Sequence, residues 1–463
     1  MVMKNNEHKI TGLLALMMVV TPLMWVLSQP MAIIFIEICS LGVLLRAMYG
    51  RIYFSRLGRL QGLVIAGILV TAAFSLIPLP FEIWMRLPGR ADYGNMIQLI
   101  NGTSVGWRQI SIVPRETEKA LWLLLPPIMT YVAVSGLNRD AVKRLIMVVI
   151  ILAVFQSVLG LIQYGAGVVS FNVLDRSAAN VATGTYLNRD HLAGFLEMTF
   201  PVILSLAVAL MGRHYFKVSP GAGLAGRGRY WASIEGNQAI LYGLAAILVI
   251  LCIIFTRSRM GILLTMIGLL LSLFAFSKRL GGNNIYGSYG TLLAVIIVLA
   301  IEIGLAPVLD RFSQDPMQDM RWEIYSTSMS GVGNFFPLGS GAGTFGQVYP
   351  AFQIPHHDFF INRAHNDYLE WFFTGGLPAV VLIMMVFYLY FRNWAQLWRS
   401  RQWDTFHFIQ VGCGIGVLLM MLHSFVDFNL HKPMNAVYFA FFLAVFMRRD
   451  GNSAHLPESA SPD

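Results

Sequence analysis

Long apolar runs recur along the whole chain and constrain its fold more than any other feature. A helix needs about 20 mostly apolar residues to cross the hydrocarbon core of a bilayer, and about twelve runs approach that length. They lie near residues 11–28, 31–49, 60–78, 118–136, 142–164, 191–212, 239–256, 259–277, 291–308, 366–391, 406–425 and 434–447. We therefore predict an all-α, polytopic membrane protein in which residues 1–450 form a single integral membrane domain.

The amino-acid composition excludes a water-soluble globule. Hydrophobic residues make up 56% of the 463 residues and charged residues only 12%, whereas soluble domains carry about a quarter charged residues. The net charge of +9 does not indicate nucleic acid, because the basic residues punctuate apolar runs instead of gathering on one soluble face. Cys39, Cys252 and Cys413 each lie inside an apolar stretch, and we interpret them as packing residues.

The distribution of Lys and Arg predicts the orientation in the membrane. When the loops are assigned to alternate sides, 20 of the 33 basic residues fall on the side of both termini. Cytoplasmic loops carry an excess of basic residues, so both termini are expected in the cytoplasm. The polar segment 451–463 is predicted to be a disordered cytoplasmic tail.

Two outer segments, 79–117 and 309–365, are too long to be simple turns. Long loops in compact proteins are often functional. The second segment is also rich in aromatic residues and glycine, a composition unlike that of disordered tails. We expect it to fold, partly as helix, over the outer end of the bundle.

Arginines on the outer side are exceptions to the charge bias. They are Arg189, Arg257, Arg259, Arg321 and Arg363. A guanidinium group binds phosphate oxygens in pairs and stays charged at any relevant pH, which suits a diphosphate. For one arginine alone, pairing with a lipid headgroup or a neighbouring acid is the more common role. The set as a whole favours an anion site.

A second candidate is the point where the longer outer segment becomes a helix. Asn366 or Asp367 can cap the first turn, which leaves His365 at the positive end of the helix dipole. A histidine there can hydrogen-bond a hydroxyl or a phosphate, and the dipole favours its neutral form. The spacing is equally consistent with a histidine that braces the loop. Asp367 and Glu370 share one helical face, a spacing that commonly serves structure.

Several of these segments together resemble the O-antigen ligase and polymerase superfamily. The motifs are His365-Asn366 with a glycine pair some ten residues later, the arginine-containing turn at 256–259, Pro337-Leu338-Gly339-x-Gly341-x-Gly343-x-Phe345, and Asn188-Arg189-Asp190-His191-Leu192-Ala193-Gly194. The resemblance spans most of the chain and is densest from 184 to 435. It implies an all-helical glycosyltransferase of the bacterial inner membrane with its active site on the periplasmic face.

The resemblance also implies the reaction and the residues that carry it. The reaction is transfer of a glycan, with inversion and without a metal or other cofactor, from an undecaprenyl diphosphate carrier to an acceptor hydroxyl. The donor diphosphate is assigned by position to Arg189, Arg259 and Arg321, and the acceptor hydroxyl or donor phosphate to His365. Residues with a supporting role are Arg257, Arg363, Asn366 and Asp367. The sequence has no short motif with the ligand spacing of a bound cation.

Three functions remain open. A polymerase has another lipid-linked glycan as acceptor, an O-antigen ligase has lipid A-core, and a flippase moves a lipid-linked glycan without chemistry. A protein glycosyltransferase is a fourth possibility, which differs from the other two enzymes only in its acceptor. Few ionisable residues interrupt the apolar runs, whereas a flippase should line its transit path with them, which favours an enzyme.

The stretch from His423 to Asn435 favours a polymerase among the enzymes. It resembles members encoded with exopolysaccharide or O-antigen assembly, so membrane lipids and polysaccharide assembly proteins are the expected partners. Asp427 and Asn429 can equally cap backbone groups in a turn between two helices. Their role is therefore left open by the sequence.

Overall fold

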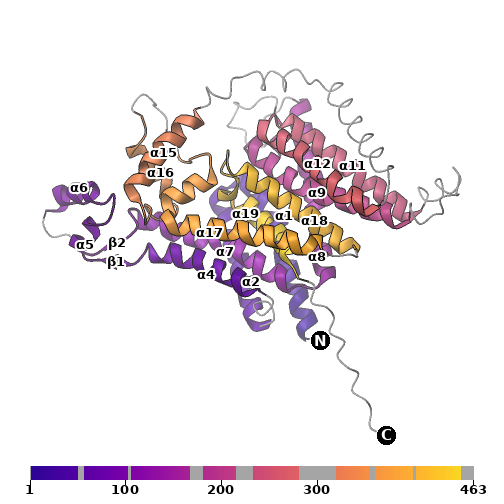
Figure 1. Cartoon of the computed structure of the whole chain (residues 1–463), viewed down its shortest axis with the longest axis horizontal. Helices are drawn as coiled ribbons and strands as arrows, with labels where there is room; N and C mark the ends of the chain where they lie inside the picture. The colour runs from indigo at the N-terminus through magenta and orange to yellow at the C-terminus, as the bar shows by residue number, and fades with distance from the viewer. Residues whose placement is uncertain are drawn as a thin grey trace, which may run out of the picture.

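The protein is an all-α polytopic membrane protein, as predicted. A computed structural model describes residues 2–50, 57–102, 106–166, 181–214, 233–280, 320–354, 360–399 and 403–449 (Figure 1). Within these ranges, nine helices are long and apolar enough to cross a membrane. They are α1 (Val2–Leu27), α2 (Gln29–Gly50), α7 (Pro114–Gly136), α8 (Arg139–Ala166), α9 (Arg189–His214), α11 (Ile234–Phe255), α12 (Arg259–Leu280), α17 (Asp367–Trp398) and α18 (Thr405–His423). Two shorter apolar helices are α4 (Arg59–Phe74) and α19 (Pro433–Met447).

Helices occupy eleven of the twelve runs that the sequence predicts to span the membrane. The remaining run, 291–308, and the predicted tail, 451–463, lie outside the described residues. The outer segments contain shorter elements. Those of the first segment are β1 (Pro78–Leu79), α5 (Phe81–Met85), α6 (Ala91–Asn101) and β2 (Arg108–Gln109), and β1 pairs with β2 in antiparallel fashion. Those of the second segment are α15 (Arg321–Phe335), α16 (Phe345–Val348) and the 3-10 turn η3 (Tyr349–Ala351).

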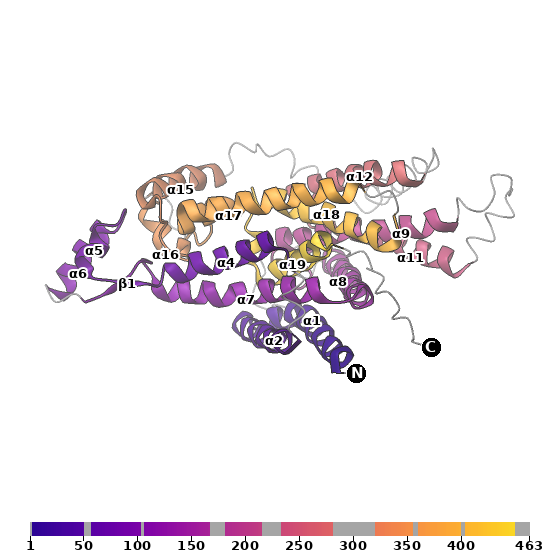
Figure 2. The same cartoon turned by 60° about the horizontal axis from the view of Figure 1, so that its bottom comes forward.

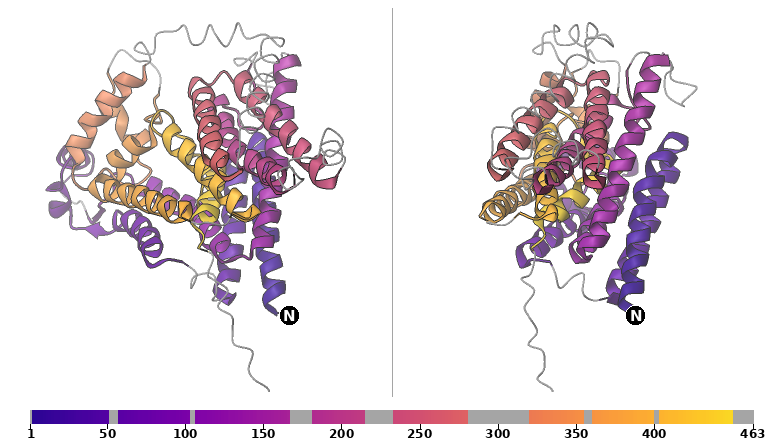
Figure 3. Two further views of the ribbon diagram at one scale, coloured as in Figure 1. Left: turned by 45° about the vertical axis from the view of Figure 1, so that its right-hand side comes forward. Right: turned by 90° about the vertical axis from the view of Figure 1, so that its right-hand side faces the viewer.

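The N-terminal hairpin lies along one side of the bundle (Figure 3). In it α1 packs on α2 and on α8, and α2 packs on α7. Apolar side chains such as Leu27, Ile38 and Leu45 remain exposed on these two helices. An apolar surface of this kind is expected where a helix faces lipid.

Helix α9 is buried against α18, α11 and α12, and Figure 2 shows it between α11 and α12. Glycines on α18 bring it backbone to backbone with α9. A Cβ on Gly416 would lie 2.1 Å from the carbonyl oxygen of Met198, and one on Gly412 would lie 2.8 Å from that of Pro201. Small residues four apart allow such close contact between membrane helices. This packing fixes the start of α9 next to the end of α18.

Helix α17 breaks at Gly376, and residues 337–341 of the longer outer segment pack into the break. Gly376 has φ 60°, a conformation that favours glycine. A Cβ there would lie 2.1 Å from the carbonyl oxygen of Pro337, and the backbone N–H of Leu377 donates to that same oxygen at 2.8 Å. The glycine pair at 375–376 and the glycine-rich run at 337–345 therefore pack against each other.

Arg90 joins the two outer segments. Its buried guanidinium donates to the backbone carbonyls of Ile110 at 2.9 Å and of Gly339 at 2.7 Å. The ring of Phe335 lies 5.7 Å from the same guanidinium. The short elements α5, α6, α15 and α16 consequently gather at one end of the molecule, where α17 begins (Figure 1).

The predicted orientation can be tested with single cysteines. Phe336 in the longer outer segment and Lys143 at the start of α8 are both exposed, whereas the native Cys39, Cys252 and Cys413 are buried. In intact spheroplasts, Phe336→Cys should react with an impermeant maleimide and Lys143→Cys should not, because the basic bias places residue 143 in the cytoplasm. The opposite labelling pattern would overturn the orientation.

Candidate active site

Four arginines line one pocket at the end of the bundle where α9 and α12 begin. Arg189, Arg259 and Arg321 are the first residues of α9, α12 and α15, and Arg257 lies in the turn between α11 and α12. The other residues of the pocket are Asp190, Met260, His423 and Asp427. Guanidinium groups outnumber carboxylates here, and helix N-termini add positive potential, so the pocket suits an anion.

Arg257 occupies a strained turn beside this pocket. Its φ of 55° lies in the left-handed region that residues other than glycine rarely adopt. The guanidinium lies over the ring of Tyr164 at 5.9 Å. Its Nε is buried and has no hydrogen-bond partner within the described ranges. A buried donor in this state needs an acceptor, and a phosphate oxygen would supply one.

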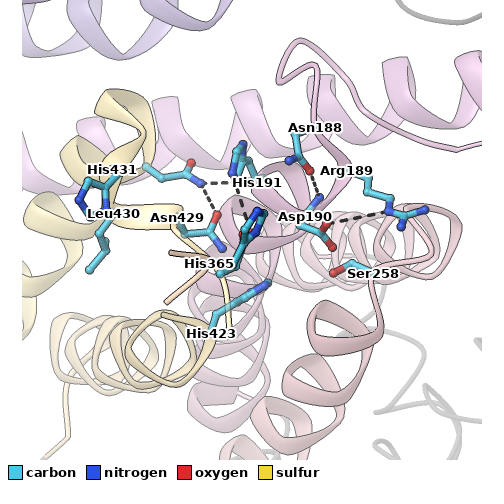
Figure 4. A network of polar contacts seen from close by, with 12 residues as sticks. Asn188, Arg189, Asp190, His191, Ser258, His365, His423, Asn429, Leu430 and His431 are labelled. Carbon is cyan, nitrogen blue, oxygen red and sulfur yellow. Dashed lines mark hydrogen bonds and ion pairs between the residues drawn. The ribbon is translucent and has the colours of Figure 1, made fainter. Parts of the chain in front are cut away.

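Asp427 lies between two histidines, after the end of α18. Its Oδ1 is 3.5 Å from Nδ1 of His365, and its Oδ2 is 3.8 Å from Nε2 of His191. Figure 4 shows His191 and His365 next to each other in this network. Asp427 and His191 are buried, whereas the side chain of His365 is 33% exposed. Both separations are longer than a good hydrogen bond, but catalytic hydrogen bonds are often long in the absence of substrate.

The surroundings of Asp427 lower the pKa of its carboxyl group. Burial alone would raise its pKa, but the hydrogen-bonding contact with His365 and the positive charge of nearby groups such as Arg321 hold the pKa well below its usual range. Asp427 therefore presents a carboxylate both to His365 and to the arginine pocket, which it also lines.

His365 is held from its backbone and from one face of its ring. The residue has φ 52°, and the hydroxyl of Tyr325 donates to its carbonyl oxygen at 2.7 Å. The ring of Phe428 meets both the His365 and the His191 imidazoles edge-on, with 4.9 Å between centroids in each case. Because Nδ1 of His365 is buried toward Asp427, the exposed part of its ring lies away from that atom.

The remaining predicted residues lie outside the lining of the arginine pocket. The side chain of Asn366 accepts a hydrogen bond from the Leu369 backbone N–H at 3.0 Å and so caps α17, one of the two caps that the sequence allowed. Arg363 forms an ion pair with Glu370 at 2.6 Å. Asp367 accepts from the backbone N–H of Leu430 at 3.0 Å. In the structure, these contacts brace the loop before α17.

His431, in the 3-10 turn η4 (Asn429–His431), completes this brace. Its Nδ1 is 2.5 Å from Asp367, and its Nε2 is 3.1 Å from Glu370. Burial would lower the pKa of His431, but the carboxylates of Glu370 and Asp367 outweigh burial and raise the pKa to about 9. The imidazolium therefore joins the start of α17 to the turn that follows Asp427.

A buried pair formed by Glu197 and His423 was not predicted. His423 ends α18 and lines the arginine pocket, and its Nδ1 lies 2.8 Å from Glu197 Oε1 on α9. Both side chains are almost fully buried. Glu197 did interrupt an apolar run, which is a general signal for a functional residue inside a membrane. No sequence pattern indicated that its partner was His423.

Residues 244–384 match the family model described as O-antigen ligase. This stretch contains three arginines of the pocket as well as His365, and it carries three of the motifs on which the resemblance rests. The match supports membership of the O-antigen ligase/polymerase superfamily. A search of curated proteins gives no match.

The match supports a ligase/polymerase-type function for the protein. Arg189, His191, His423 and Asp427 lie outside residues 244–384. They reach the candidate site because α9 and α18 pack closely together. The roles of the individual site residues remain predictions.

Lysine substitutions test whether the pocket binds a diphosphate through guanidinium geometry. Arg259→Lys and Arg321→Lys keep the charge but lose the planar fork, so each should lower glycan transfer by roughly 100-fold while the protein still inserts in the membrane. Transfer is measured with a purified lipid-linked donor. Arg144→Lys, an exposed arginine on α8, is the matched control and should behave as the wild type. Near-wild-type transfer in both pocket variants would argue against diphosphate binding there.

Proposed function

We propose that this protein is a polysaccharide polymerase of the O-antigen or exopolysaccharide type. It transfers a glycan from undecaprenyl diphosphate to a hydroxyl of a second lipid-linked glycan at the periplasmic face of the bacterial inner membrane. The observation that carries the proposal is the arginine pocket next to His365, with Asp427 shared between them. A group-transfer enzyme needs an anion site for its leaving group beside a base for its acceptor.

The arginine pocket would hold the diphosphate of the donor. As the bond between the anomeric carbon and the diphosphate oxygen breaks, the electron pair stays on that oxygen and negative charge develops there. Arg189, Arg257, Arg259 and Arg321 surround this position with fixed positive charge. Donors that are already in place stabilise a developing charge without reorganisation during the reaction. The pocket therefore turns the diphosphate into an adequate leaving group.

His365 would activate the acceptor. Its Nδ1 faces the Asp427 carboxylate, so the ring carries its proton on that side and Nε2 is free to accept the proton of a hydroxyl. The hydroxyl oxygen then attacks the anomeric carbon, and its proton passes to His365. Attack opposite the departing diphosphate inverts the anomeric centre. None of these steps calls on a metal ion.

Transfer to lipid A-core by an O-antigen ligase uses the same donor site and the same base. Only the acceptor differs, and the likeness of residues 423–435 to polysaccharide assembly members favours a polymerase. A lipid-linked glycan flippase would need neither a base nor a strained arginine turn. The contact between Asp427 and His365 therefore supports an enzyme over a flippase.

Glycan profiling of a deletion strain distinguishes these functions. Loss of a polymerase should abolish long polysaccharide chains, whereas single repeat units should be retained. Loss of a ligase would instead remove all polymer from lipid A-core and let carrier-linked polymer accumulate. Loss of a flippase would leave single lipid-linked repeats inside the cytoplasmic leaflet. Only the first of these profiles agrees with the proposal.

His365→Ala tests the proposed base. Turnover should fall by roughly 100- to 10,000-fold, the range usual for general base catalysis, whereas donor affinity should change little because the arginines carry it. Both quantities are measured per folded molecule in purified protein. Asp427→Asn removes the carboxylate that orients the imidazole, so it should also lower turnover and alter its dependence on pH.

His407→Ala is the matched control, because His407 lies near the opposite end of α18 from the site. Its turnover should remain within about twofold of the wild type. If His365→Ala reduces only the yield of folded protein, and the surviving molecules turn over normally, His365 is a brace for the loop and not the base.

A further inference from the structure

A second, larger cavity lies at the end of the bundle opposite to the candidate site. It measures about 1010 Å³. Its walls come from the start of α4, the end of α7, the start of α8, the second half of α17 and the end of α19. Because α17 and α19 both begin beside the candidate site, their last turns, which line the second cavity, lie at the other ends of these helices. The proposed reaction uses no residue of this second cavity.

Five arginines line the second cavity. They are Arg59, Arg139, Arg392, Arg448 and Arg449. No carboxylate belongs to the described lining, although Arg139 pairs with Asp404 beyond it at 2.8 Å. Arg59, Arg392 and Arg449 form no ion pair with any described residue of the chain. Excess positive charge is thus concentrated around one cavity.

The walls of the second cavity are also partly apolar. Leu60, Leu389 and Met447 contribute to the lining, together with the amides of Gln61 and Gln396. Such a mixture suits a ligand with a charged end and an apolar end. The volume lies at the upper end of the range usual for sites that enclose a small molecule or part of a lipid.

An excess of basic residues at a cytoplasmic membrane edge has a general explanation in the topology of insertion. That explanation predicts arginines scattered over the loops, as Arg144 and Arg399 are, both exposed and outside the cavity. It does not predict arginines from four distant parts of the chain converging on one cavity with apolar walls. Basic pockets between membrane helices on the cytoplasmic side commonly bind anionic headgroups.

We propose that the second cavity binds the phosphate headgroup of an anionic phospholipid, with the first part of its acyl chains against Leu60, Leu389 and Met447. The arginines supply paired hydrogen bonds to phosphate oxygens. A bound lipid would also join α4, α8, α17 and α19 at the end of the bundle that lies away from the catalytic residues. This assignment is independent of the proposed glycan transfer.

Lipid retention by the purified, full-length protein tests this site. The protein in neutral detergent is titrated with dioleoylphosphatidylglycerol, and bound lipid is counted by native mass spectrometry. Arg392→Gln combined with Arg449→Gln should weaken retention by about 10- to 30-fold, because each basic residue near the headgroup contributes modestly to its binding. Arg144→Gln combined with Arg399→Gln is the matched control, since it removes the same charge at the same end but outside the cavity, and it should stay within twofold of the wild type.

Two further titrations identify the ligand. Dioleoylphosphatidylcholine, which has the same chains and no net charge, should be retained less than phosphatidylglycerol. Inorganic phosphate at the same concentration should not displace the lipid. If the double variant does not fold, as judged by thermal unfolding, Arg392→Gln and Arg449→Gln singly carry the same test with smaller effects.

Three outcomes would overturn the assignment. Equal retention of phosphatidylglycerol by the cavity variant and the wild type would show that the lipid does not bind in this cavity. An equal loss in the control variant shows a general attraction of lipid to the basic rim. Displacement of the lipid by inorganic phosphate alone shows a site for free phosphate and not for a lipid. Because the readout is bound lipid and not turnover, each outcome is separate from the fate of the proposed function.

Discussion

The carboxylate of Glu370, buried in the first turn of α17, is the contact on which the candidate site depends. It accepts from the guanidinium of Arg363 and the backbone N–H of Ala364, and it lies against the His431 imidazolium. These contacts join the end of the longer outer segment, α17 and the turn after α18. Removing one partner of a buried charged group typically costs about 3–5 kcal/mol. Because Arg363 and Ala364, the two residues before His365, are both anchored on Glu370, His365 is held toward Asp427 despite its unfavourable φ.

Backbone strain and close packing coincide at this end of the molecule. Three residues other than glycine have positive φ in the described ranges, namely Leu187, Arg257 and His365. Leu187 precedes α9, Arg257 lies in the turn before α12, and His365 precedes α17. Arg257 and His365 belong to the candidate site, and Leu187 lies two residues before Arg189. Strain of this kind persists only where the surroundings over-determine the backbone. Here the surroundings are the glycine contacts of α18 and α17 and the charges around Glu370.

The two cavities place positive charge at opposite ends of one bundle, and they use it differently. Near His365, arginines at helix starts combine with helix dipoles in a small and mostly polar pocket, which suits a charge that develops during a reaction. Near Arg392, arginines share a larger space with apolar walls, which suits a ligand that stays bound. Helices α17 and α19 connect the two ends.

The sequence by itself determined the membrane helices, because apolar runs of sufficient length have no other stable arrangement in a bilayer. It also identified Asn366 as one of two caps for α17 and singled out five outer arginines, since caps and charges against the topological bias are local signals. Four of these five line the arginine pocket. Only the tertiary structure decided that these arginines share one pocket, that Arg363 and Asp367 belong to the brace around Glu370, and that Asp427 faces His365. The pairing of Glu197 with His423 and the cavity near Arg392 were likewise invisible in the sequence. Each of these contacts joins residues that are distant in the chain. The distance between such residues depends on how the helices pack. Glycine contacts and buried charges set that packing, and no local sequence pattern reveals them.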